Sequence, residues 1–282
     1  MSCSNQNILI GSYFLLASTL ISLLCGILVM ILCIKKTFIE DFTLKIIVYM
    51  TFNDIIRSLA MILVSFFNKV VIICQISAYI IETTFVSNIY WAISISTTLY
   101  RVIIVKDCDY KAFHKIWVFI AFVVVPVLQA IPFVTESYGI NDNECAFGTG
   151  KIDNIWRLCL VYIPAWLSLL IMTLVYFKIK KIIGKITDSP AYDIIFIRGY
   201  IYSLIIGIII IPFTILRILQ AFMQNNCFLI DFSIVAECWL ALHGVFNGIA
   251  LCMNKKIRKG LFSKTVTTED FLTSFEDISH DH

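Results

Sequence analysis

Charged residues are scarce in this 282-residue chain, at 15%, whereas hydrophobic residues reach 60%. Soluble domains usually hold about 25% charged and about 45–50% apolar residues. The 22 Lys and Arg residues against 19 Asp and Glu residues give a net charge of only +3, which is too small for a nucleic-acid-binding surface. These shortages exclude a soluble enzyme, a disordered chain and a nucleic-acid binder. The mean hydropathy of +0.90 indicates a protein embedded in a lipid bilayer.

The chain also lacks the short motifs that accompany catalysis or metal binding. It has no C-x-x-C pair, no Cys/His ligand spacing, no H-E-x-x-H, no G-x-S-x-G and no Walker sequence. We therefore expect no metal, no cofactor and no enzymatic activity. Several of its 10 cysteines lie inside apolar runs and are interpreted as small buried hydrophobes: Cys25, Cys33, Cys159, Cys238 and Cys252.

Long apolar runs predict an all-α membrane protein, a bundle of seven transmembrane helices. A spanning helix needs about 20 predominantly apolar residues, and seven stretches meet this requirement. The last stretch is interrupted by Glu237 and His243. The predicted spans are Ile8–Ile34, Leu44–Phe67, Val71–Val105, Ile116–Thr135, Ile155–Ile183, Ile194–Phe222 and Asp231–Met253.

The distribution of basic residues predicts the orientation of the bundle. Of the 22 Lys and Arg residues, 17 lie in or beside the connections after the first, third, fifth and seventh spans. Only Lys69, Lys151 and Arg157 lie in or beside the connections on the other side. Because cytoplasmic loops are enriched in Lys and Arg, we expect the N-terminus outside and the C-terminus inside the plasma membrane.

Ionisable residues inside a bilayer are expensive, so they usually face protein or water. Asp54 and Arg57 are three residues apart and share one helix face. They are either a neutral pair that fixes helix packing or a polar element that repacks on activation. In the seventh span, His243 and Asn247 stand beside Gly244 and Gly248, a G-x-x-x-G pattern that permits close helix approach.

Other polar and aromatic residues in the outer halves of the spans are candidates for a ligand pocket. Glu82 either lines a cavity or makes an interhelical contact. Arg217 and Glu237 either pair with each other, or Arg217 extends to the membrane surface, or they form a charged rim. Interfacial aromatic residues lie at similar depth. The pocket candidates are Glu82, Trp156, Tyr162, Arg217, Glu237 and Trp239.

Two cysteines are placed to form a disulfide on the oxidising side of the membrane. Cys74 is at the outer end of the third span, and Cys145 is in the middle of the outer connection Glu136–Asn154. A bond between them would tie this connection across the mouth of the bundle. Cys227 either pairs with Cys3 or is free.

In this arrangement the chain resembles the G-protein-coupled receptors, in particular the cyclic-AMP-receptor-like group, class E, and more distantly the secretin and adhesion receptors. The rhodopsin-like class is disfavoured, because Leu99-Tyr100-Arg101 stands where that class has Asp-Arg-Tyr. A cyclic AMP ligand is not favoured, because the outer face has few Lys and Arg residues for a phosphate. The similarity extends over about Leu44–Leu261 and is carried by Ile131-Pro132 with Tyr138-Gly139 and Cys145, by Trp156-Arg157 with Tyr162, Pro164 and Trp166, and by Leu242–Asn247 with Asn254.

This resemblance implies a receptor that binds an extracellular ligand and activates a heterotrimeric G protein through rearrangement of the helix bundle. Asp54, Arg57, His243 and Asn247 are then candidates for switch or packing residues. Basic residues at the inner ends of the spans are candidates for contacts with the G protein, although topology and attraction to anionic lipid also account for them. These contact candidates are Arg101, Lys178, Lys180, Lys181, Lys185 and Arg198.

The chain is expected to form one membrane domain, residues 1–262, followed by a polar cytoplasmic tail, residues 263–282. Residues 254–262 alternate basic and apolar side chains, which suits a short amphipathic helix on the inner membrane surface. The tail carries Ser and Thr among acidic residues. It is either a plain solvated tail or a substrate of a receptor kinase that then recruits an arrestin-like protein.

The main competing function is a transporter or channel for a small solute. Such proteins often contain inverted repeats and broken helices around a polar path. The sequence shows no internal repeat, and charges inside the predicted spans are sparse. A photoreceptor would have a Lys in the outer half of the seventh span, and none is present there.

Overall fold

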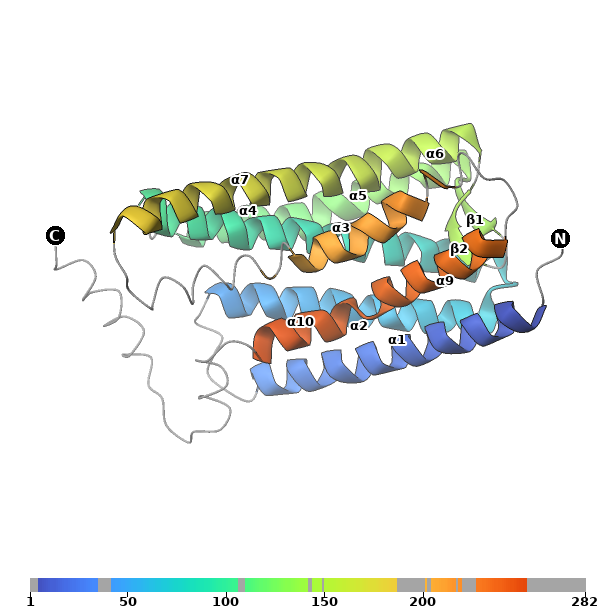
Figure 1. The fold of residues 1–282 in the computed structure, drawn as a ribbon. Helices are drawn as coiled ribbons and strands as arrows, with labels where there is room; N and C mark the ends of the chain where they lie inside the picture. Colours follow the sequence, from blue (N-terminus) through green and yellow to red (C-terminus); the bar gives the residue numbers. More distant parts are fainter. Residues whose placement is uncertain are drawn as a thin grey trace.

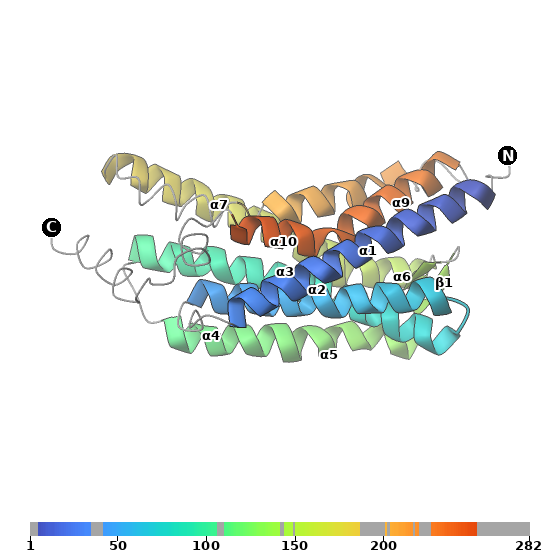
Figure 2. The ribbon, with the colours of Figure 1, turned by 90° about the horizontal axis from the view of Figure 1, so that it is seen from below.

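The computed structural model describes residues 5–34, 42–105, 110–141, 144–148, 150–186, 201, 204–216, 218–219 and 227–252. Within these residues the fold is all-helical apart from one two-stranded hairpin (Figure 1). The helices lie along one common direction and form an elongated bundle (Figures 1 and 2). The continuous helices are α1 (Asn5–Ile34), α2 (Phe42–Phe67), α3 (Val71–Tyr100), α4 (Tyr110–Phe119), α5 (Val125–Ala130), α6 (Lys151–Arg157), α7 (Ile163–Ile186), Leu204–Leu216, α9 (Cys227–Ala241) and α10 (His243–Cys252).

Five helical segments are long and apolar enough to cross a membrane. A sixth is added when α9 and α10, which are bent by 40° at their junction, count as one span. The chain is therefore a multi-pass membrane protein. Its long candidate spans are Ile10–Cys33, Lys45–Phe67, Val71–Tyr100, Phe113–Thr135 and Lys151–Ile182.

Helices α2 and α3 form the centre of the bundle. In α2 and in α3, 56% of the most apolar 18-residue window is buried inside the bundle. The corresponding share is 22% in α1 and in the segments that contain α5 and α7. Figures 1 and 2 both place α9 beside the beginning of α1 and α10 beside its end, so these segments run parallel. The beginning of α1 and the end of α10 consequently lie toward opposite ends of the bundle.

The predicted span Ile194–Phe222 is described only in part, and within it Leu204–Leu216 forms an apolar helix. Two other features differ from the prediction. The predicted continuous span Asp231–Met253 is broken at Leu242 between α9 and α10. The fifth span begins at Lys151 rather than Ile155, because Asp153 Oδ2 accepts a hydrogen bond from Gly150 N at 3.0 Å and caps the helix.

Two of the intramembrane prolines follow a π-helical turn, which widens the helix by one residue. In η3 (Ile120–Val124), Val125 N–H donates to Ile120 O, five residues back. The next residue is Pro126, which has no N–H to continue this pattern. Pro164 follows η5 (Leu158–Tyr162) in the same way, after the bond from Ile163 N–H to Leu158 O. Both turns therefore free backbone carbonyls inside the bundle.

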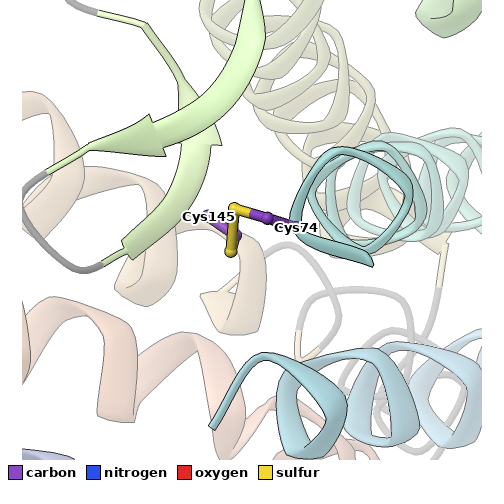
Figure 3. The surroundings of a disulfide bond; sticks show 2 residues. All are labelled: Cys74 and Cys145. Carbon is purple, nitrogen blue, oxygen red and sulfur yellow. A yellow bond between two sulfur atoms is a disulfide. The ribbon is translucent and has the colours of Figure 1, made fainter. Parts of the chain in front are cut away.

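The outer connection Glu136–Asn154, predicted as a loop of turn residues, contains a β-hairpin. Strands β1 (Tyr138–Asn141) and β2 (Glu144–Phe147) pair antiparallel, with Gly139 opposite Ala146. The chain turns into β1 at Glu136, whose φ of 52° is left-handed. The predicted Cys74–Cys145 disulfide is present and joins β2 to the beginning of α3 (Figure 3), with Cα atoms 5.1 Å apart.

Candidate functional site

A buried polar cluster centred on Asp54 joins α2, α3 and α10 in the middle of the bundle. Asp54 Oδ1 accepts hydrogen bonds from Arg57 Nη2 at 2.5 Å and Asn88 Nδ2 at 2.8 Å, and lies 2.8 Å from His243 Nδ1. Asp54 Oδ2 accepts a hydrogen bond from Asn247 Nδ2 at 2.7 Å. One carboxylate thus holds side chains from three helices.

The cluster continues through α3 to the fourth span. Asn53 Nδ2 donates to Ser87 Oγ and to Asn88 Oδ1, both at 3.0 Å. Ser87 Oγ in turn donates to Ala121 O at 3.2 Å. Ala121 lies in η3, five residues before Pro126, so its carbonyl is one of those freed by the proline. The hydroxyl of Ser87 therefore satisfies a backbone acceptor that the helix cannot.

All members of this cluster are buried, none more than 3% exposed. A buried ion pair repays its desolvation only when its remaining polar atoms are also hydrogen-bonded. Asp54 meets this condition, because both carboxylate oxygens have partners on other helices, whereas Arg57 meets it only in part, because its Nη1 has no partner. The sequence predicted the Asp54–Arg57 pair and separately named His243 and Asn247, and the structure brings all four together.

Four buried polar atoms in this region have no hydrogen-bond partner: Arg57 Nη1, His243 Nε2, Asn247 Oδ1 and Ser22 Oγ. The carboxylate of Asp54 only accepts, so its 2.8 Å contact assigns a proton to His243 Nδ1, and Asn247 Nδ2, 3.1 Å from the same atom, then donates to Asp54 Oδ2 alone. In neutral His243 the unpartnered Nε2 then holds the basic lone pair. Each such buried atom is a candidate for function, because unsatisfied polar groups are rare in native interiors.

Glycines of α10 bring this helix close to α1 beside the cluster. A Cβ added at Gly244 would lie 2.5 Å from Ser22 Oγ and 3.4 Å from Asp54 Cβ. A Cβ added at Gly248 would lie 2.7 Å from Cys25 Sγ. Both distances are too short for a side chain, so the G-x-x-x-G pattern permits the close approach that the sequence indicated.

At the end of the bundle that carries the hairpin, a buried arginine connects the hairpin to the fifth span. Arg157 is 7% exposed, and its Nη2 donates to Phe147 O at 2.5 Å and Gly148 O at 3.2 Å. Its Nη1 donates to Asn154 Oδ1 at 3.3 Å. In the sequence, Arg157 was one of the few basic residues predicted outside and part of the Trp156-Arg157 pair that contributes to the resemblance. Its role depends on the fold of the hairpin, which no local pattern specifies.

A second series of polar contacts links the hairpin to the fourth and fifth spans. Tyr138 is buried against Phe147, with ring centroids 4.6 Å apart, and its hydroxyl donates to Gln129 O at 2.9 Å. Gln129 Nε2 donates to Leu160 O at 3.2 Å, in the π-helical turn before Pro164. Burial raises the pKa of Tyr138, and the nearby Glu82 charge adds to this effect, so the phenol stays protonated as a donor.

The predicted pocket residues do not surround one described cavity. Trp156 Nε1 donates to Thr135 Oγ1 at 3.0 Å, and Tyr162 Oη donates to Phe213 O at 3.4 Å. Glu82 and Glu237 are half-buried on α3 and α9. Arg217 lies outside the described residues.

A groove of about 310 Å³ between α1 and α9 has mainly apolar walls and includes only Trp239 of the pocket candidates. Its lining residues are Phe14, Ser18, Ile234, Val235, Cys238, Trp239 and Leu242.

The candidate G-protein contacts that the structure describes gather near the ends of α3 and α7 that lie opposite the hairpin. The guanidinium of Arg101 lies 3.6 Å from the ring centroid of Phe113. The ammonium of Lys178 lies 5.7 Å from the ring centroid of Tyr100, which brings the two helices together. Lys180 and Lys181 are exposed. The side chain of Lys185, Arg198, the predicted helix 254–262 and the tail 263–282 lie outside the described residues.

The structure thus defines the chain as a multi-pass, mainly helical membrane protein with a buried polar cluster around Asp54 and a hairpin anchored by a disulfide. Comparison with models of known families and with curated proteins gives no match. Function must therefore be argued from the geometry of this chain.

Proposed function

We propose that the chain is a G-protein-coupled receptor that senses an extracellular ligand and activates a heterotrimeric G protein. The observation that carries the proposal is the Asp54 cluster. It joins α2, α3 and α10 through hydrogen bonds to one carboxylate. Such a cluster has a small number of discrete arrangements, because the carboxylate can exchange its hydrogen-bond partners only when the helices shift together.

The disulfide-anchored hairpin supports the same function. It attaches the outer connection to α3 by Cys74–Cys145 and to α6 by Arg157. A ligand that contacts the hairpin acts on two spans at once. It shifts the bundle between states only by as much as it binds one state more tightly than the other.

A transporter is the second candidate, and one specific observation favours it. The break between α9 and α10 lies directly at the buried Asp54–His243 contact. Broken helices beside buried ionisable residues occur at the substrate sites of secondary transporters. The sequence shows no internal repeat of the kind that such transporters often contain, so we prefer the receptor.

Ligand-independent nucleotide exchange distinguishes the two functions. The purified full chain in lipid nanodiscs is expected to accelerate GTP binding by at least one heterotrimeric G protein in a panel, relative to empty nanodiscs. Combined replacement of the exposed Lys178, Lys180 and Lys181 by Ala should weaken this exchange at low salt, because exposed charges steer association.

The matched control is Lys151→Ala, which removes an exposed Lys at the hairpin end of the bundle. It should leave the exchange rate unchanged. No exchange with any G protein, together with solute or ion flux in liposomes holding the same preparation, would replace the receptor by the transporter.

A further inference from the structure

We propose that Asp54 and His243 together form a proton-binding site, and that its occupancy sets the bend between α9 and α10. His243 is the first residue of α10 and directly follows the break at Leu242. Its Nδ1 lies 2.8 Å from Asp54 Oδ1. The contact that would exchange the proton is therefore also the contact that holds the beginning of α10. This proposal does not depend on receptor activity.

Packing around the pair favours a proton over a larger ligand. Asp54 and His243 are each 1% exposed. On the side of α1, the space at Gly244 is closed by Ser22 Oγ, which would lie 2.5 Å from an added Cβ. A buried water already needs a cavity of about 10–15 Å³. A proton needs no cavity of its own, so its uptake at this pair is opposed by charge and not by lack of space.

The hydrogen-bond pattern identifies the nitrogen atom that can take up a proton. Asp54 accepts the Nδ1 proton of His243, so the lone pair of neutral His243 is on Nε2, which is buried without a partner. Proton uptake gives an imidazolium ion beside the carboxylate, or a neutral carboxylic acid beside the imidazole. We treat the two groups as one coupled site that binds one additional proton.

The surrounding charges determine which state of the bundle takes up the proton. Among the described residues, the ionisable groups that face His243 are Asp54 and Arg57 from α2, and α1 contributes the Cys25 thiol next to Gly248. The residues facing the cluster from α3, Ser87 and Asn88, are neutral.

With neutral His243, the Asp54–Arg57 pair has no net charge, and one more proton leaves a net charge of +1. An uncompensated charge is unfavourable in the bilayer interior. The packed arrangement therefore excludes the proton, and a rearranged bend that admits water accepts it. By linkage, lower pH favours the rearranged bend.

Two aromatic rings on either side of the break at Leu242 provide a fluorescence signal for the bend between α9 and α10. Trp239 of α9 stacks on Phe246 of α10, with ring centroids 5.3 Å apart and an angle of 24° between the planes. The two rings lie on opposite sides of Leu242 in the sequence, so a change of the bend must change their contact. Trp239 fluorescence therefore reports the bend directly.

The experiment follows Trp239 fluorescence of the full chain in nanodiscs from about pH 8 to about pH 5, the range in which His changes charge. The signal of Trp239 is isolated as the difference from a Trp239→Phe variant. In the wild type we expect a reversible change with pH. In His243→Asn, whose amide still donates to Asp54 but binds no proton in this range, the signal should remain at the wild-type value of pH 8.

The matched control is His114→Asn, which removes the half-buried His of α4 and should titrate like the wild type. If His243→Asn does not fold, the proposal is tested by an NMR titration in which Asp54 and His243 themselves are not substituted. The chain has four His residues, and replacing the other three (His114, His280 and His282) by Asn leaves the ring nitrogens of His243 as the sole histidine signals in a ¹⁵N NMR titration.

These signals should show the proton on Nδ1 at pH 8 and a change between pH 8 and pH 5 that parallels the fluorescence. Ring-nitrogen signals that stay constant over this range would overturn the proposal. Coincident fluorescence titrations of the wild type and His243→Asn would overturn it equally.

Discussion

Asp54→Ala is expected to lower the free energy of unfolding by about 3–5 kcal/mol, because it leaves the buried Arg57 without its counter-charge. The same change removes the acceptor of Asn88, His243 and Asn247. Arg57 is 1% exposed, so it cannot recover this loss by solvation in the packed bundle. Of the substitutions considered for this chain, this one removes the most interhelical hydrogen bonds at a single position.

Denaturant titration of the protein in mixed micelles measures this loss. The double variant Asp54→Ala/Arg57→Met removes both charges and should be less destabilised than Asp54→Ala alone, because no unpaired charge is left buried. Asp231→Ala is the matched control, since Asp231 is an exposed aspartate of α9, and its effect should lie within about 0.5 kcal/mol. Equal stability of Asp54→Ala and Asp231→Ala would show that the cluster does not hold the helices together.

Arg157→Ala is expected to destabilise the hairpin by about 2–4 kcal/mol, because hydrogen bonds to a charged group contribute more than neutral ones. The guanidinium donates to Phe147 O, Gly148 O and Asn154 Oδ1. Its loss leaves the two carbonyls without this donor. Arg157→Lys should recover only part of the effect, because an ammonium group does not reproduce the planar fork of a guanidinium.

Hydrogen–deuterium exchange of the hairpin amides measures this change. In Arg157→Ala the peptides covering β1 and β2 should exchange faster, while those of α2 and α3 should be unchanged because the disulfide still holds Cys145 to Cys74. Lys151→Ala, an exposed residue at the beginning of α6, serves as the control and should exchange like the wild type. Unaltered exchange of β1 and β2 in Arg157→Ala would contradict the role assigned to this arginine.

The sequence predicted the helices well because the bilayer fixes both their length and their apolar composition. It also predicted the Asp54–Arg57 pair, since residues three apart share a helix face. The contact between Asp54 and His243 spans 189 residues. Local periodicity does not specify how two distant helices rotate against each other, so this contact could not be derived.

Features that depend on tertiary packing were missed or misplaced. The bend at Leu242 falls in an apolar run without a proline, and the strands of the hairpin are only four residues long. Gln129 drew no attention as a single polar residue, although it connects Tyr138 with Leu160. The start of the fifth span was signalled by Gly150 and Asp153, whose capping pattern was overlooked.

Membrane topology tests the receptor proposal most directly, because a receptor of this kind crosses the bilayer an odd number of times. Epitope tags at Met1 and His282 are probed on intact and on permeabilised cells. The tag at Met1 should be accessible to antibody on intact cells, and the tag at His282 only after permeabilisation. Accessibility of both tags on the same face of the membrane would contradict the proposed receptor.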